Sequence, residues 1–229
     1  MARAHTDHAY EAELRQLREQ ILLMGAHVEE IVATAMRALV ERDSDLARIT
    51  IRKDAAVNRL ELETDDLCLR ILARRQPVAS DLRFIATSLK LVTDLERMAD
   101  VGVNICERVL ELNEEAPLRP YVDLVTMAEV AQGMVHEALD AFVERDAARA
   151  KSVLVRDEVL DAYYDQTFRD LLTYMMEDPR NIYRATRIQS VAKYLERIGD
   201  HATNVAEMVV FMIDGEDIRH LRRSVPPQA

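Results

Sequence analysis

The stretch LERMADVGVNICE at residues 95–107 returns in modified form as LERIGDHATNVAE at residues 195–207. The two stretches lie 100 residues apart and share the Leu, Glu, Arg, Asp, Asn and second Glu in register. A shorter segment, Val-Glu-Arg-Asp, occurs at residues 40–43 and again, at an offset of 103, at residues 143–146. Matches that keep a nearly constant spacing indicate an internal duplication of one unit of about 100 residues.

The composition of the repeated unit favours helices. The chain has only 5 Gly, 6 Pro and no Trp in 229 residues, and its apolar residues recur at helical spacing. Prolines at 77, 117, 120 and 179 interrupt the pattern, and Ser44 is a suitable N-cap for a second helix. The predicted helices cover about residues 14–39, 44–75, 79–113, 121–144, 147–176 and 180–213.

The sequence therefore predicts an all-α fold of six long helices in two pseudo-symmetric three-helix bundles. The first three-helix repeat is expected at residues 1–113 and the second at residues 118–213. Residues 214–229 lose the helical periodicity and are expected to form a flexible tail.

The repeated stretch carries side chains that can bind a metal. At about 100° per residue, its four oxygen-bearing positions fall within an arc of roughly 80° that borders the apolar face. A neighbouring helix of each repeat supplies a pair of such residues one turn apart. The candidate ligands are Asp54, Asn58, Glu96, Asp100, Asn104 and Glu107 in the first repeat, and Asp157, Asp161, Glu196, Asp200, Asn204 and Glu207 in the second.

Carboxylate clusters suit hard cations such as Fe³⁺, Mn²⁺, Mg²⁺ or Ca²⁺. Because Asn58 replaces a carboxylate in the first set, the ligand count predicts a stronger site in the second set. The alternative is that these residues are ordinary acids of a solvated helix surface. The duplication of the pattern in register favours the metal site.

Several other functions are excluded or disfavoured. A net charge of −11 argues against nucleic acid as a partner, because phosphate contacts need Lys and Arg patches. No apolar run is long enough for a membrane span, and the two cysteines lack metal-type spacing, which fits a reducing cytoplasm. A di-metal oxidase of the ferritin type needs Glu-x-x-His, whereas Ala99 and Gly199 stand three residues after the two glutamates. A metal-free helical scaffold that binds a basic partner remains an open alternative.

The doubled motif Leu-Glu-Arg-[Ile/Met]-[Gly/Ala]-Asp-x3-Asn-x2-Glu resembles that of the PhoU family of phosphate-regulatory proteins. The resemblance covers roughly residues 10–213. It implies two related three-helix bundles with multinuclear iron, or alternatively zinc, on their surface, while manganese and magnesium remain possible. The family motif falls on Glu96/Asp100 and Glu196/Asp200, with Asp157/Asp161 as a companion pair, and Asp54/Asn58 departs from it.

The resemblance also implies a function. It points to a cytoplasmic, non-enzymatic regulator that restrains high-affinity phosphate uptake and the phosphate-starvation response. The implied partners are the ATPase of the phosphate ABC transporter, the phosphate sensor histidine kinase and a second copy of the chain in a homodimer. Contact with the membrane is expected only through these partners.

Overall fold

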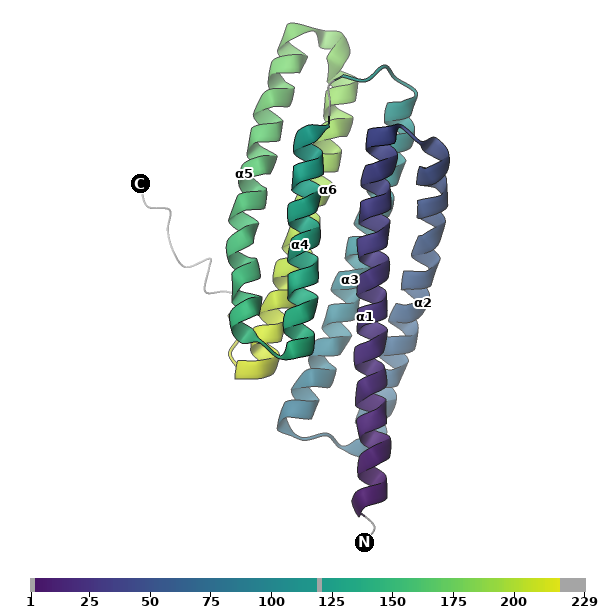
Figure 1. Ribbon diagram of the computed structural model, residues 1–229, viewed down its shortest axis with the longest axis vertical. Coiled ribbons are helices and arrows are strands. Elements are labelled where there is room, and N and C mark those ends of the chain that lie inside the picture. The colour runs from purple at the N-terminus through teal and green to yellow at the C-terminus, as the bar shows by residue number, and fades with distance from the viewer. Residues whose placement is uncertain (1–2, 119–120, 219–229) are drawn as a thin grey trace, which may run out of the picture.

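Six long α-helices make up almost all of the computed structural model, which describes residues 3–118 and 121–218 (Figure 1). No strand occurs in these two ranges, so the predicted all-α fold is confirmed. The elements are α1 (Arg3–Glu41), α2 (Ser44–Arg75), α3 (Ala79–Asn113), α4 (Val122–Glu144), α5 (Ala147–Glu177), the short 3₁₀ helix η1 (Pro179–Asn181) and α6 (Ile182–Asp214).

The repeated segment Val-Glu-Arg-Asp forms the same turn in both halves. Arg42 and Arg145 both adopt the left-handed conformation with φ of 56°, which ends α1 and α4. The next residue then begins the following helix: Asp43 accepts a hydrogen bond from the amide of Leu46, at 2.8 Å, and Asp146 caps α5 in the same way. The N-cap of α2 is therefore Asp43, and the prediction of Ser44 was wrong by one residue.

The two turns allow a test of backbone strain, because the two arginines make different contacts beyond the turn. Arg145 Cζ lies 5.9 Å from the centre of the Phe84 ring, in a cation–π contact with the other half of the molecule. Arg42 donates to the backbone oxygens of Leu112, Asn113 and Glu115 at 3.2, 3.1 and 2.5 Å. We expect Arg145→Gly to leave the free energy of unfolding nearly unchanged, since the relief of positive-φ strain offsets the loss of the cation–π contact, each about 0.5–1 kcal/mol. Arg42→Gly should lower it by about 1 kcal/mol, because the lost hydrogen bonds outweigh the relief. Urea unfolding measures both, and equal effects at the two sites would contradict this explanation.

The halves pack together along two pairs of helices. Within each half the three helices contact one another, and between halves α3 packs against α6 and α1 against α4. Figure 1 shows α1 and α4 in front of α3 and α6, with α2 and α5 on the outer flanks. The rings of Phe84 and Phe142, which stack with centroids 5.5 Å apart, also join the two halves.

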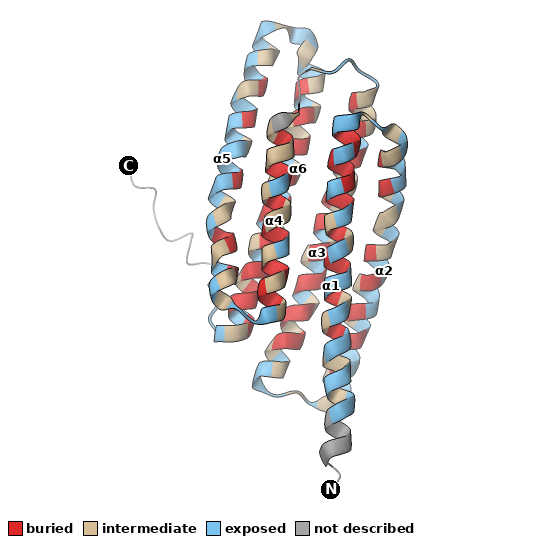
Figure 2. Ribbon diagram, in the orientation of Figure 1, coloured by how far each residue is buried: buried red, intermediate tan, exposed pale blue. Residues whose placement is uncertain are grey.

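One hydrophobic core contains residues of all six helices. Figure 2 shows the buried residues on the facing sides of the helices and exposed residues along the outer sides of α2 and α5. The division into one three-helix repeat at residues 1–113 and a second at residues 118–213 stays a prediction.

The predicted helices agree with the observed ones to within a few residues, except at α1. That helix begins at Arg3, although its apolar periodicity begins only near Leu14. Most of the predicted tail, residues 219–229, lies outside the described residues. None of the helices in the described ranges has an apolar stretch of the length that a membrane span requires.

Candidate functional site

The structure places the predicted ligands of the first repeat on the facing sides of α2 and α3. We call this group the first acidic cluster; it comprises Asp54, Asn58, Glu61 and Asp65 of α2 with Glu96 and Asp100 of α3. The four α2 residues follow the spacing i, i+4, i+7, i+11 of a single helix face. Glu61 and Asp65 were not among the predicted ligands.

Burial and the neighbouring negative charges raise the pKa values of several carboxylates in this cluster. Burial raises the pKa of Glu96, and the negative charge of Asp100 raises it further. Burial likewise raises the pKa values of Asp54, Glu61 and Asp65, with a contribution from Asp100 at Asp54 and from Asp65 at Glu61. The direction of these shifts indicates that burial and mutual repulsion disfavour the ionised carboxylates, and a bound cation would offset both.

Three buried oxygens of the cluster have no hydrogen-bond partner among the described residues. They are Asp54 Oδ1, Asp65 Oδ1 and Glu96 Oε2. The other oxygen of Asp54 accepts a hydrogen bond from Asn58 Nδ2 at 2.8 Å, and Glu96 Oε2 lies 3.4 Å from Arg97 Nε in an ion pair. A buried carboxylate oxygen without a hydrogen bond is costly, and a bound cation would remove that cost.

The donor set fits a hard cation, since it consists of carboxylate oxygens and one amide. Within residues 3–118 and 121–218, however, no group of three or more His, Cys, Asp or Glu side chains is arranged so that it could hold a metal ion. Binding one ion would therefore require side-chain movement.

The second acidic cluster lies between α5 and α6 and consists of Asp157, Asp161, Glu196 and Asp200. Asp157 lies against α6, since its Oδ1 is 3.6 Å from the position that a Cβ on Gly199 would take. Burial is the main cause that raises the pKa of Asp200, and the negative charge of Asp161 adds to it. The structure thus brings the four predicted carboxylates of this repeat together.

A lysine already occupies part of the second cluster. Lys193 Nζ donates to both oxygens of Glu196 at 2.6 Å and lies 5.5 Å from the centre of the Tyr164 ring. Burial disfavours the lysine cation, but its hydrogen bonds to Glu196 and the charges of Glu196 and Asp200 outweigh this, so the pKa of Lys193 is raised. The protein itself therefore supplies a cation to this cluster.

The two clusters differ at the positions that decide their charge. Thr93 stands in the first repeat where Lys193 stands in the second, and Glu61 stands where the second has Tyr164. The number of carboxylate ligands that was counted from the sequence in each repeat took neither difference into account. The first cluster has more carboxylates and lacks an internal lysine, although Arg97 pairs there with Glu96 and Asp100 at 3.4 and 3.5 Å. The ranking of the two sites stays a prediction.

We expect Lys193→Thr, which installs the residue of the first repeat, to open the second cluster to external cations. Without the competing ammonium group, its affinity for Mn²⁺ should rise by roughly tenfold, about 1.4 kcal/mol. Titration calorimetry measures this, and Lys90→Thr, which removes an exposed lysine of α3 outside both clusters, serves as the control. Unchanged Mn²⁺ binding in Lys193→Thr would show that the lysine does not block a cation site.

The predicted ligands at the C-terminal ends of the two repeated stretches, Asn104, Glu107, Asn204 and Glu207, lie away from the clusters. Glu96 and Glu107 share a helix face, but 11 residues of helix separate them by about 16 Å, too far to share one ion. Glu107 is exposed and lies 3.6 Å from Arg108. Asn104 and Glu207 are partly buried, one and two turns beyond the aspartates of their helices.

Asn204 contacts the other half of the molecule. Its Nδ2 donates to Asp94 Oδ1 of α3 at 3.1 Å, and the same oxygen is 2.8 Å from His201 Nδ1. Asp94 was missed because its counterpart in the repeat is Tyr194, so a search for matching positions passes over it. The arrangement joins α3 to α6 directly beside Asp200.

Known proteins resemble the chain over nearly its whole length. The family model of the PhoU domain matches residues 21–109 and 124–209, one match in each half. The phosphate-specific transport system accessory protein PhoU homolog of Pseudomonas putida is 44% identical over 218 residues, which is 95% of this chain and 85% of the relative. Phosphate-specific transport system accessory protein PhoU of Escherichia coli K12 is 37% identical over 95% of this chain and 90% of its own length.

Solved structures agree with this relationship. The crystal structure of PhoU from Pseudomonas aeruginosa matches with a TM-score of 0.86 and 45% identity, covering 90% of this chain and 100% of that one. The phosphate transport system regulatory protein PhoU from Streptococcus pneumoniae matches with a TM-score of 0.84 and 31% identity, over 91% of this chain and 98% of its own. With a family match in each half and relatives of this similarity, the chain belongs to the PhoU family.

Proposed function

We propose that this chain is a cytoplasmic regulator of phosphate transport that restrains high-affinity uptake and the phosphate-starvation response when phosphate is plentiful. Membership of a family whose members are named as accessory proteins of the phosphate-specific transport system supports this proposal. In this role the chain acts by binding, without catalysis of its own. Its partners are the ATPase of the phosphate transporter, the phosphate sensor kinase and a second copy of the chain.

Cation binding is the second part of the proposal. The observation that carries it is the set of buried oxygens without hydrogen bonds in the first acidic cluster: Asp54 Oδ1, Asp65 Oδ1 and Glu96 Oε2. These residues, with Glu61 and Asp100, would hold the ion. Iron is the first candidate, followed by zinc, manganese and magnesium. A bound cation supplies positive charge that offsets the mutual repulsion of the carboxylates and links α2 to α3.

The second acidic cluster is compatible with a different function from the first. Because Lys193 neutralises Glu196 without a metal, this half fits a metal-free scaffold surface as well as a weaker cation site. We therefore assign the tighter cation site to the first cluster.

The regulatory function is tested in a bacterial strain from which the native copy of the gene has been deleted. When this chain is supplied in trans, a phosphate-starvation promoter should be silent in high phosphate and active in low phosphate. The empty vector should leave the promoter active in both media. A promoter that stays active in high phosphate, with the chain present at normal levels, would refute the proposed function.

A further inference from the structure

A long groove runs along the junction of α1 and α4, on a face that neither acidic cluster occupies. Two adjoining hollows of about 580 and 320 Å³ form it, and they share Ala33, Glu129 and Gln132. It extends from Ala26 to Glu41 on α1, a distance of about 22 Å, which equals roughly four helical turns. We call this feature the central groove.

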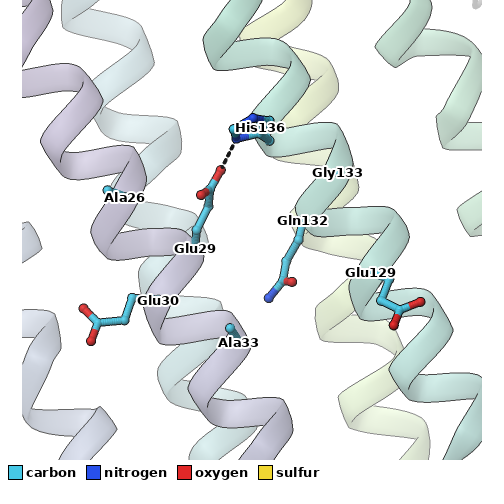
Figure 3. Close-up of a pocket in the computed structure, with 8 residues that line it drawn as sticks. All are labelled: Ala26, Glu29, Glu30, Ala33, Glu129, Gln132, Gly133 and His136. Carbon is cyan, nitrogen blue, oxygen red and sulfur yellow. Dashed lines mark hydrogen bonds and ion pairs between the residues drawn. The ribbon is translucent and has the colours of Figure 1, made fainter.

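The floor of the central groove consists of small and apolar residues. Ala26, Ala33, Ala128 and Gly133 leave the two helix backbones close to the surface, and the buried Met36 also lines the groove. Figure 3 shows Glu29 and Gln132 pointing into the gap between the helices, whereas Glu30 and Glu129 project from its outer shoulders. Small residues in a groove between two helices allow the backbone of a third helix to approach closely.

The charge of the central groove favours a positively charged binding partner. Four carboxylates line it (Glu29, Glu30, Glu41 and Glu129), against one guanidinium group, that of Arg37. Glu29 is paired with His136 at 3.1 Å and Glu30 with Lys53 at 2.5 Å. Within the described part of the chain, neither Glu41 nor Glu129 has an ion-pair partner. The shoulders thus offer unpaired negative charge on both sides of an apolar floor.

We propose that the central groove is the docking site for an amphipathic helix of about four turns, with small apolar residues on one face and Lys or Arg along its edges. This inference rests on the proposed function and gives it a contact surface: the helix belongs to the partner protein. Helix-in-groove binding of this kind combines an apolar face with charges that fix orientation. A second copy of the chain fits less well, because it would bring a net charge of −11 to an acidic groove.

Photo-crosslinking to the purified transporter ATPase tests the proposal. Ala33→Cys places a thiol on the groove floor for a benzophenone maleimide, and Ala73→Cys places one on the exposed last turn of α2 as a control. The native thiols do not compete, since Cys68 and Cys106 are buried and burial raises the pKa of each to about 12. The expected product joins Ala33→Cys to a basic helical peptide of the ATPase, with none from Ala73→Cys.

A binding measurement with groove variants complements the cross-linking. Ala33→Arg and Glu129→Lys should each weaken ATPase binding by at least about tenfold. The matched variants Ala73→Arg and Glu63→Lys make the same changes at exposed positions of α2 and should bind normally. Equal affinities in the two sets would overturn the proposal.

The remaining outcomes separate this inference from the proposed function. A complex that forms without any cross-link from Ala33→Cys would overturn the groove as the docking site and leave the regulatory function standing. A cross-link to a second copy of the chain, or to residues 219–229 of the same chain, would overturn the partner helix. Gene silencing in vivo without any wild-type binding to the ATPase would also overturn the inference.

Discussion

Exchange of Glu96, Asp100, Glu196 and Asp200 for their amides is expected to activate the phosphate-starvation genes even in high phosphate. The four substitutions remove two carboxylates from each cluster while they preserve side-chain size. Loss of cation-bridged contacts should weaken partner binding by roughly tenfold or more, about 1.4 kcal/mol. Promoter activity in the deletion strain and a pull-down of the transporter ATPase measure the two effects.

The matched control replaces four exposed glutamates outside the clusters by glutamine: Glu19, Glu63, Glu158 and Glu177. It changes the net charge by the same amount and should keep the genes silent. Both proteins should show the same helical content by circular dichroism. If the cluster variant also silences the genes at normal protein levels, the clusters do not take part in signalling.

The second large effect concerns thermal stability. A cation that binds the folded chain at 100 times its dissociation constant adds about 2.7 kcal/mol, which corresponds to roughly 5–11 °C in the midpoint for a protein of this size. We expect the wild type to show this rise with Mn²⁺ and Glu96→Gln to lose most of it. Differential scanning calorimetry with and without the cation measures the difference.

In the presence of a chelator, the same variant should be more stable than the wild type. Burial and the charge of Asp100 raise the pKa of Glu96 above its ordinary value of 4.5. A carboxyl group with a raised pKa stabilises the fold below its ordinary pKa, and this contribution is lost as the pH rises through the raised value. Glutamine keeps the uncharged form at neutral pH, so its midpoint should rise by about 2–4 °C for each kcal/mol regained. A lower midpoint for Glu96→Gln in chelator would contradict the assigned repulsion.

Much of the fold could be predicted because the helices are long and each break has a local cause. Pro77, Pro117 and Pro179 end apolar periodicities, and the repeated Val-Glu-Arg-Asp forms the same turn twice. The start of α1 could not be predicted, since residues before Leu14 carry little apolar periodicity. The choice between Ser44 and Asp43 as the cap also depended on backbone geometry, because both residue types cap helices well.

The candidate site was predicted in part. Angular position on the helix correctly grouped Glu96 with Asp100 and Glu196 with Asp200, and the companion pairs lie where expected. Grouping by angle alone does not include the rise along the helix axis. Glu107 was therefore grouped with Glu96, although three helical turns separate the two residues. A search by repeat also favours matching residues, and it therefore missed Glu61, Asp65, Lys193 and Asp94, whose counterparts in the other half differ.

Differences between the repeats explain why the two halves would have different roles. Duplication produced two similar clusters, but substitutions at single positions gave one extra carboxylates and the other a lysine. The halves remain coupled through the shared core and through Asp94, which holds His201 and Asn204 next to Asp200. The two clusters lie on different helix pairs, but α3 of the first packs against α6 of the second.

Elemental analysis of protein purified without chelators tests most directly the claim that the first acidic cluster is the main cation site. The wild type should contain at least one equivalent of iron, zinc or manganese per chain. Glu96→Gln/Asp100→Asn should lose most of this metal, and Glu196→Gln/Asp200→Asn should retain most of it. Full metal content in Glu96→Gln/Asp100→Asn, or a wild type without metal, would contradict the account.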